Sequence, residues 1–141
     1  MTLTAILISI LIGIAIYFYS VKSHSSRPQA DIQYTYNIVG ENAYQKNLLK
    51  IAGQKKAVSK FHECTAHVLS EPFNQYDPNA IKVEINGLTV GYLSKLEAEK
   101  LKGQIINKKV PAVINGGWYV NEDDEGSYGV KLAISNAKDL I

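Results

Sequence analysis

The sequence contains only one cysteine, Cys64, among its 141 residues. A single thiol cannot form an internal disulfide, and this agrees with a chain that works in a reducing compartment. The composition is otherwise ordinary, because 46% of the residues are hydrophobic and 20% are charged. These values are typical of a globular protein, and the length allows one domain.

Charged residues are absent from residues 1–21, and residues 3–19 are nearly all isoleucine, leucine, alanine or aromatic. About 20 helical residues span about 30 Å, the hydrocarbon thickness of a bilayer. We therefore predict one N-terminal transmembrane helix over residues 1–21. The alternative is a cleaved signal peptide, but no basic residue precedes the apolar run and no clear A-x-A site follows it.

Residues 22–33 are polar and show no periodicity, which predicts a linker between this anchor and a folded domain over residues 34–137. Lys22 and Arg27 follow the predicted span, and no basic residue precedes it. The positive-inside rule then places the C-terminal side in the cytoplasm. The sequence thus predicts a single-pass membrane protein with a cytoplasmic C-terminal domain.

Few residues are arranged for catalysis or for metal binding. His62, Cys64 and His67 have the only metal-like spacing in the chain. On a strand, however, His62 and Cys64 face one side and His67 the other, and the sequence offers no evident fourth ligand. His24 has serine neighbours but lies in the linker, where it is too mobile to preorganise chemistry. We therefore expect no enzyme activity, no cofactor and no metal.

The most informative stretch is residues 71–93, EPFNQYDPNAIKVEINGLTVGYL. Its first half sets prolines, asparagines and an aspartate around Phe73 and Tyr76. Proline fixes φ, and Asn and Asp hydrogen-bond their own backbone, so a well-defined loop is expected. Residues 80–85 then alternate between the two faces of a half-buried strand. Asn86 and Gly87 predict a two-residue hairpin turn, after which a second strand returns over residues 88–93.

The rest of the chain predicts further short strands and two short helices. Strands are expected over residues 34–39, 61–69, 108–119 and 127–135, the third being bent at its pair of glycines. One helix is expected over residues 42–52, ending at Gly53, and another from Ser94, which opens a capping box, to Gly103. Many short strands with two short helices indicate a β-rich α+β domain in the form of a small barrel.

The order of residues in the central stretch closely resembles the HIRAN domain. The resemblance is carried by Asn74-Gln75-Tyr76-Asp77-Pro78-Asn79-Ala80-Ile81-x-Val83, by Asn86-Gly87 and by Val90-Gly91-Tyr92-Leu93. It extends back to Ile38-Val39-Gly40 and Tyr44 and, less clearly, forward to about residue 135. The resemblance implies a compact, OB-like β-barrel with two short helices. In fork-remodelling helicases this module grips the 3′ end of single-stranded DNA.

The resemblance also implies a nucleic-acid-binding site, whose candidate residues are Asn74, Tyr76, Asp77, Tyr92, Lys95 and Tyr128. Tyr92 stands at a position that is aromatic or His in the DNA-binding members, and Tyr128 matches more loosely as a further stacking ring. Tyrosine faces stack on bases, and Asp77 can accept a hydrogen bond from a terminal sugar hydroxyl. Structural roles stay open beside these, because Asp77 and Asn79 also form turns and Tyr92 is also a candidate core residue.

One part of the family pattern is missing. DNA-binding members carry a basic residue and an aromatic residue two and three positions after the glycine that follows the first strand. Asn42 and Ala43 occupy those positions here, and only Tyr44 remains. Because each stacked base contributes about 1–3 kcal/mol, the loss of one ring predicts a weaker binder.

Charge also bears on nucleic-acid binding. Fifteen basic and thirteen acidic residues give a net charge of +2, far below the strong basicity of most phosphate binders. Four of the acidic residues lie together at 122–125, so a positive face requires that this turn points away from the site.

The sequence thus leaves two candidate functions. One is a membrane-anchored module that recognises single-stranded DNA, including its 3′ end. The alternative is a membrane-tethered domain that binds a protein or small ligand and does not bind DNA.

Overall fold

The computed structural model describes residues 8, 10, 12, 14, 16 and 31–141. The chain divides into two compact units, Met1–Ile32 and Gln33–Ile141. Most of the predicted transmembrane segment, residues 1–21, and most of the predicted linker, residues 22–33, lie outside the described residues. In the part of the chain that is described, no helix is both long enough and apolar enough to cross a membrane.

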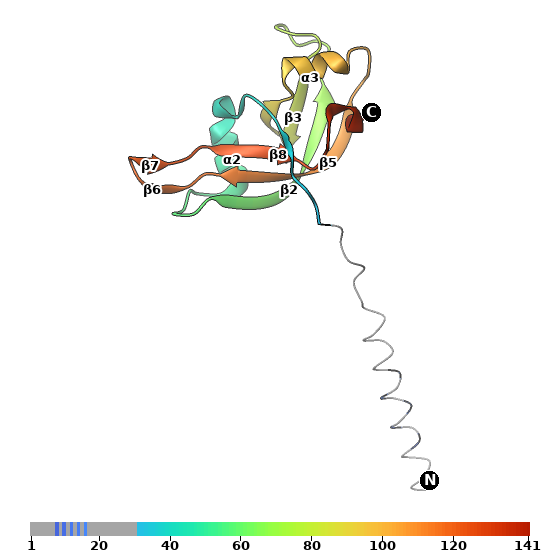
Figure 1. The fold of residues 1–141 in the computed structure, drawn as a ribbon, viewed down its shortest axis with the longest axis vertical. Coiled ribbons are helices and arrows are strands. Elements are labelled where there is room, and N and C mark those ends of the chain that lie inside the picture. Colours follow the sequence, from blue (N-terminus) through green and yellow to red (C-terminus); the bar gives the residue numbers. More distant parts are fainter. Residues whose placement is uncertain (1–7, 9, 11, 13, 15, 17–30) are drawn as a thin grey trace. The chain divides into compact units, whose positions relative to one another are not determined.

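The second unit is a β-rich α+β fold built on a curled, six-stranded antiparallel sheet (Figure 1). In spatial order its strands are β1 (Tyr36–Asn37), β8 (Tyr128–Leu132), β5 (Asn107–Gly116), β2 (Lys60–Ser70), β3 (Ile81–Ile85) and β4 (Leu88–Tyr92). The two longest strands, β2 and β5, lie next to each other in the middle of the sheet. This architecture confirms the β-rich class, and β2, β3 and β4 lie within one residue of their expected ranges. The expected strands 34–39 and 127–135 are shorter, the first being reduced to β1 and an isolated bridge at Val39.

The curl brings the two edges of the sheet together. Val39 follows β1 by two residues and pairs with Tyr92 of the opposite edge strand, β4. The Val39 N–H donates to the Tyr92 carbonyl (2.8 Å), and the Tyr92 N–H donates to the Val39 carbonyl (2.9 Å). One short segment, residues 36–39, therefore pairs with β8 at its start and with β4 at its end.

The predicted hairpin forms as the sequence indicates. Asn86 (φ 52°) and Gly87 (φ 74°) both have positive φ, as a type I′ turn requires. The aliphatic residues of β3 are at most 3% exposed and belong to one hydrophobic core, whereas Lys82 and Glu84 are only partly buried on the other face. The alternation predicted for residues 80–85 is thus confirmed for β3.

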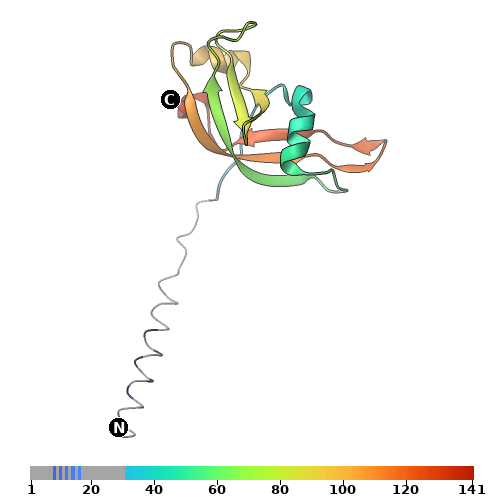
Figure 2. The same cartoon turned by 180° about the vertical axis from the view of Figure 1, so that it is seen from behind.

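Two short α-helices pack against the sheet. The first expected helix consists of a 3-10 turn, η1 (Glu41–Tyr44), and α2 (Gln45–Ala52), which packs against β4 and β8 (Figure 2). Gln45 fixes it there, because its amide both accepts from the backbone N–H of Tyr128 and donates to its carbonyl. The second, α3 (Lys95–Lys100), begins at Ser94, whose hydroxyl accepts from the Glu97 N–H (3.3 Å).

The C-terminal region ends in η2 (Ala137–Leu140), a 3-10 turn that packs against α3. Leu140 is only 3% exposed, so the folded unit continues beyond residue 137.

A two-stranded hairpin projects from the sheet at its other end. It comprises β6 (Tyr119–Asn121) and β7 (Asp124–Glu125). The expected long strand 108–119 stops at Gly116 because Gly116 and Gly117 both have positive φ, which turns the chain away from the sheet. The Trp118 ring lies against Gly126, where an added Cβ would come within 2.1 Å of it, and its Nε1–H donates to Asp124 Oδ1 (3.0 Å).

Closure of the sheet can be tested at Gly91. A Cβ at this position would lie 2.6 Å from the Val39 carbonyl oxygen, so we expect Gly91→Ala to lower the free energy of unfolding by about 1–3 kcal/mol. The control is Gly129→Ala, also in a strand, where the added Cβ would meet only the side chain of Asn115. Urea denaturation of the 141-residue chain measures both. Equal losses of stability would contradict a special role for the contact between Val39 and Gly91.

Candidate functional site

The loop between β2 and β3, residues 71–80, is held in shape by its own side chains. The Asn74 side-chain oxygen accepts hydrogen bonds from the backbone N–H groups of Tyr76 (2.9 Å) and Asp77 (3.1 Å). Asp77 Oδ1 accepts another from the N–H of Asn79 (2.8 Å). Asn and Asp favour such turns because their short side chains reach backbone donors two or three residues ahead. The β2–β3 loop therefore has a defined shape without a ligand.

A cavity of about 410 Å³ lies between this loop, β4, the start of α3 and residues 39–44. We call it the tyrosine pocket, and the residues of interest in its lining are Tyr44, Asn74, Tyr76, Asp77, Tyr92 and Lys95. It thus gathers five of the six predicted binding residues, contributed by the loop, a strand and a helix. Its lining combines three aromatic rings with a carboxylate, that of Asp77, and an ammonium group, that of Lys95.

Three tyrosines form the aromatic part of the pocket. The ring centroids of Tyr44 and Tyr92 are 6.3 Å apart, and the ring planes are tilted by 45°. Tyr76 is 87% exposed, so its ring face is open to solvent. Tyr92 is partly buried. Burial, together with hydrogen bonds to the side chains of Tyr44 and Glu71, raises the pKa of its hydroxyl well above the usual 10. Tyr92 therefore remains a hydrogen-bond donor at neutral pH.

The polar side chains of the pocket differ in how many of their hydrogen-bonding atoms are already used within the protein. Asn74 has a structural role, because its oxygen holds the loop backbone and its Nδ2 donates to Glu71 Oε2 (3.0 Å). Asp77 uses only Oδ1 in the loop, and within residues 31–141 its Oδ2 has no hydrogen-bond partner. Lys95 is the exposed first residue of α3. The pocket therefore offers one carboxylate oxygen and one ammonium group to a ligand.

A chain of charged side chains lies behind the pocket. Lys82 Nζ is 3.3 Å from Glu71 Oε1 and 2.7 Å from Glu84 Oε1, and all three side chains are between 20% and 25% exposed. Burial of Glu71 opposes its ionisation, but hydrogen bonds from Asn74, Lys82 and Tyr92 outweigh this effect and lower the pKa of its carboxyl. Glu71 is therefore ionised at neutral pH and links the loop to β3 and β4.

Tyr128, the sixth predicted residue, lies elsewhere. It is 3% exposed, and its hydroxyl donates to the Gly53 carbonyl next to the end of α2. Its ring covers Gly117, where an added Cβ would come within 2.2 Å of it. The cavity that Tyr128 lines is a different one, shared with Gln45 and Lys46. Tyr128 therefore packs in the core, and its ring face is not presented to the tyrosine pocket.

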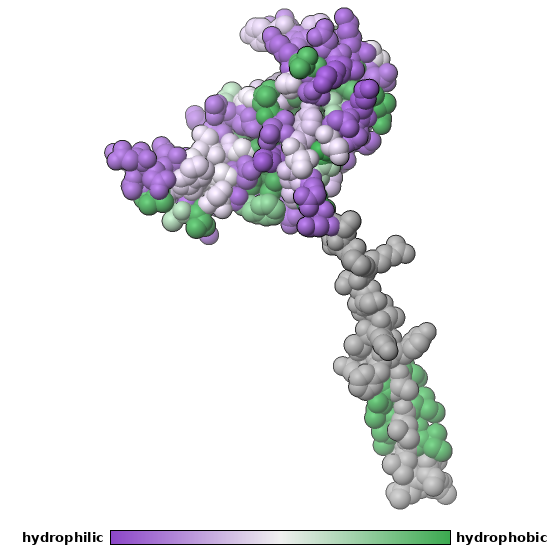
Figure 3. Space-filling model, viewed as in Figure 1, coloured by the Kyte–Doolittle hydropathy of each residue, from purple (hydrophilic) through white to green (hydrophobic). Residues whose placement is uncertain are grey.

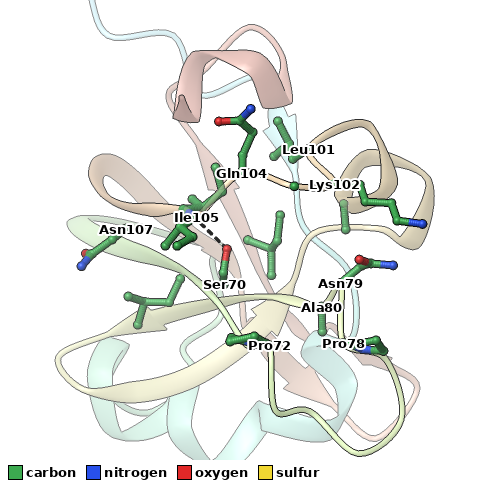
Figure 4. Close-up of a pocket in the computed structure, with 15 residues that line it drawn as sticks. Ser70, Pro72, Pro78, Asn79, Ala80, Leu101, Lys102, Gln104, Ile105 and Asn107 are labelled. Carbon is green, nitrogen blue, oxygen red and sulfur yellow. Dashed lines mark hydrogen bonds between the residues drawn. The ribbon is translucent and has the colours of Figure 1, made fainter.

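A second cavity, of about 480 Å³, lies on the other side of the β2–β3 loop (Figure 4). Its wall is mostly aliphatic, and the Ser70 hydroxyl at its edge already accepts the N–H of Ile106 (2.8 Å). Figure 4 shows the polar ends of Asn79, Lys102 and Asn107 pointing away from its centre. Binding sites for small ligands usually combine an apolar wall with a few converging polar groups. The tyrosine pocket meets this description and the larger cavity does not.

The acidic turn lies away from the tyrosine pocket. Residues 122–125 form the tip of the β6–β7 hairpin, which projects to the side remote from α3 in both ribbon views (Figures 1 and 2). Figure 3 shows that the tip is covered with hydrophilic side chains. Glu125 pairs with Lys55 (3.0 Å), a lysine that follows α2, so the positive charge of that lysine is neutralised there. The condition set by the sequence, that the turn points away from the site, is met.

The histidines and the cysteine of β2 do not form a metal site. His67 Nε2 is 2.6 Å from Asn107 Oδ1, and the Cys64 thiol faces the Ala112 carbonyl (3.6 Å). Within the described residues, no group of three or more His, Cys, Asp or Glu side chains is placed to hold a metal ion.

A scan against protein-family models, a search of curated proteins and a search of solved structures each found no match to this chain.

Two residues of this region, Tyr44 and Glu71, are not among the binding residues predicted from the sequence. Tyr44 belongs to the family resemblance but is not among the predicted site residues, because its place across from Tyr92 depends on closure of the sheet through Val39. Nothing in the sequence indicates that Glu71 belongs to the site, because a carboxylate at the end of a strand is usually solvated. Its partner Lys82 was recognisable only as an outward-facing residue of β3.

The lowered pKa of Glu71 predicts a pH dependence of stability. Its folded-state pKa lies below the usual 4.5, so its contribution is fully present above about pH 4.5 and is lost as the pH falls through the folded pKa. We expect the difference in free energy of unfolding between the wild type and Glu71→Gln to shrink between pH 6 and pH 3. Urea midpoints across this range measure the difference. Parallel curves for the two proteins would contradict the assignment.

Proposed function

We propose that residues 33–141 form a module that binds single-stranded nucleic acid, with the end of a DNA strand seated in the tyrosine pocket. The observation that carries the proposal is the convergence of Tyr76, Tyr92, Asp77 and Lys95 on one cavity. Proteins that bind single strands combine aromatic side chains, on which bases stack, with cations that neutralise the backbone. The tyrosine pocket contains both kinds of group.

Each group has a definite role in this proposal. The exposed ring of Tyr76 stacks on a terminal base, and Tyr92 with Tyr44 forms the wall on which the sugar or the next base rests. Lys95 pairs with a phosphate at the start of α3. Asp77 Oδ2 accepts a hydrogen bond from the 3′-hydroxyl of the terminal sugar.

The resemblance to the HIRAN domain agrees with this reading. It led to five residues that line one cavity, although they are spread over residues 74–95. In the same proposal the curled sheet is an OB-like barrel, closed by the pairing of Val39 with Tyr92. Closed barrels of this type often bind oligonucleotides.

The affinity is expected to be modest. Asn42 and Ala43, which replace a basic and an aromatic residue of the DNA-binding members, are both exposed on η1 next to the pocket residue Tyr44. They provide neither a ring for stacking nor a positive charge. Binding should therefore be weak and strongly dependent on salt.

The first test uses labelled single strands with a free or a blocked 3′ end, titrated at low salt against the 141-residue chain. We expect the free end to bind more tightly. Tyr76→Ala should lower the affinity by about 1–3 kcal/mol through loss of one stacked base. The matched control is Phe73→Ala, which removes an aromatic ring that is 98% exposed on the same loop but does not line the pocket.

Three outcomes would contradict the proposal. Equal affinity for free and blocked ends would remove recognition of the 3′ end, and an unchanged affinity of Tyr76→Ala would remove the stacking. Absence of binding to any strand at low salt would leave the alternative function, a tethered domain that binds a protein or small ligand.

We also propose that the apolar N-terminal segment anchors the module in a membrane, with the module in the cytoplasm. This rests on the uncharged residues 1–21 and on Lys22 and Arg27 after them. In cells, the chain should fractionate with membranes. A reporter that works only in the cytoplasm should be active when fused to the C-terminus, and a reporter that works only outside the cytoplasm should be inactive there. A reporter active outside the cytoplasm would overturn the orientation.

A further inference from the structure

Glu71 occupies the point at which the β2–β3 loop leaves the sheet. Its backbone N–H donates to the Ala80 carbonyl (2.9 Å), which joins the two ends of the loop. Its own carbonyl accepts from the Asn74 N–H (3.0 Å), and its carboxylate accepts from the Asn74 side chain. Asn74 in turn holds the backbone of Tyr76 and Asp77. The position of both pocket residues therefore depends, through Asn74, on Glu71.

The same carboxylate is tied to the two strands beside the loop. One oxygen pairs with Lys82 of β3, and the side chain also hydrogen-bonds with Tyr92 of β4. Among the described residues, the titratable or charged groups that face Glu71 are thus Lys82 and Tyr92, with Glu84 and Tyr44 one step further away. Glu71 thus links the β2–β3 loop to β3 and to the aromatic wall of the pocket.

The chemistry of Glu71 and Tyr92 fixes which of the two donates. A carboxylate only accepts, so the Tyr92 hydroxyl donates to Glu71. Asp77 Oδ2 is left as an acceptor in the pocket. It favours a ligand that donates a hydrogen bond, such as one with a free hydroxyl group.

We propose that Glu71 is the positioning residue of the tyrosine pocket, where it orients the β2–β3 loop and Tyr92 so that the pocket accepts hydrogen bonds from a terminal sugar hydroxyl. The inference rests on the proposed function for its ligand. It goes beyond that function because it names the residue that sets the selectivity. That residue, Glu71, lies outside the lining of the pocket.

The experiment compares Glu71→Gln with Glu84→Gln in the 141-residue chain. Both changes replace a carboxylate partner of Lys82 by an amide of the same size, but among the described residues the Glu84 side chain has no hydrogen bond or ion pair to the loop or to Tyr92. The probes are two DNA strands of one sequence, one ending in a 3′-hydroxyl and the other in a 3′-deoxy sugar. Hydrogen exchange of the Tyr76 and Asp77 amides, which donate to Asn74, is measured in the same proteins.

We expect Glu71→Gln to bind the hydroxyl-ended strand about tenfold more weakly and to lose most of the preference for it. Its Tyr76 and Asp77 amides should exchange faster, whereas Glu84→Gln should match the wild type in both measurements. A second variant, Tyr92→Phe, keeps the ring but removes the donor to Glu71. It should reduce the preference for the hydroxyl without faster exchange in the loop, and it covers the case in which Glu71→Gln does not fold.

The outcomes separate this inference from the proposed function. If the wild type binds and Glu71→Gln binds equally well with unchanged exchange, the positioning role is overturned while the proposed function stands. An equal effect of Glu84→Gln would also overturn it, because loss of charge beside Lys82 would then be the cause. If the wild type binds neither strand, the proposed function fails, and the role in selectivity fails with it.

Discussion

Two backbone hydrogen bonds between Val39 and Tyr92 determine how the folded unit is arranged. Without them, β1 and β4 would be the free edges of a curled sheet. With them, the chain that leaves Val39 must turn at Gly40 (φ 84°) directly beside β4. It then enters η1, which places Tyr44 against Tyr92. Closure of the sheet and construction of the pocket therefore depend on the same contact.

Neighbouring polar residues of the pocket region have different roles, some bonding within the protein and others remaining for a ligand. Asn74 uses its oxygen and its amide N–H within the protein, and Glu71 is satisfied by Asn74, Lys82 and Tyr92. Buried or half-buried polar groups need such partners, because an unsatisfied group costs the free energy of its lost hydration. The side-chain groups that remain for a ligand are the Tyr76 ring, Asp77 Oδ2 and the Lys95 ammonium group, which take no part in this network.

Much of the fold could be predicted from local patterns. The turn at Asn86 and Gly87, the alternation in β3 and the start of α3 at Ser94 each depend on residues close in sequence, and all three are present in the structure. The bend after β5 followed from Gly116 and Gly117 for the same reason. Closure through Val39 could not be predicted this way, because it pairs residues more than fifty positions apart.

The grouping of the candidate residues in space was predictable to a similar extent. Five candidates lie in one stretch, and the hairpin and α3 bring them together. Tyr128 was the exception, because its ring is placed in the core by Gly117 and by Gly53 at the end of α2, and Gly53 is far from it in the chain. The role of Glu71 likewise depends on Lys82 and Tyr92, which reach it only once the strands have paired.

The β6–β7 hairpin has a consequence for how this chain can be observed. Trp118 is the only tryptophan of the sequence, and it belongs to the hairpin rather than to the hydrophobic core. Its indole rests on Gly126 and is held by Asp124. Intrinsic tryptophan fluorescence therefore reports the local state of the hairpin, and it is a poor reporter of events beside α3. Tyrosine signals, which arise from both the core and the pocket, follow the rest of the domain.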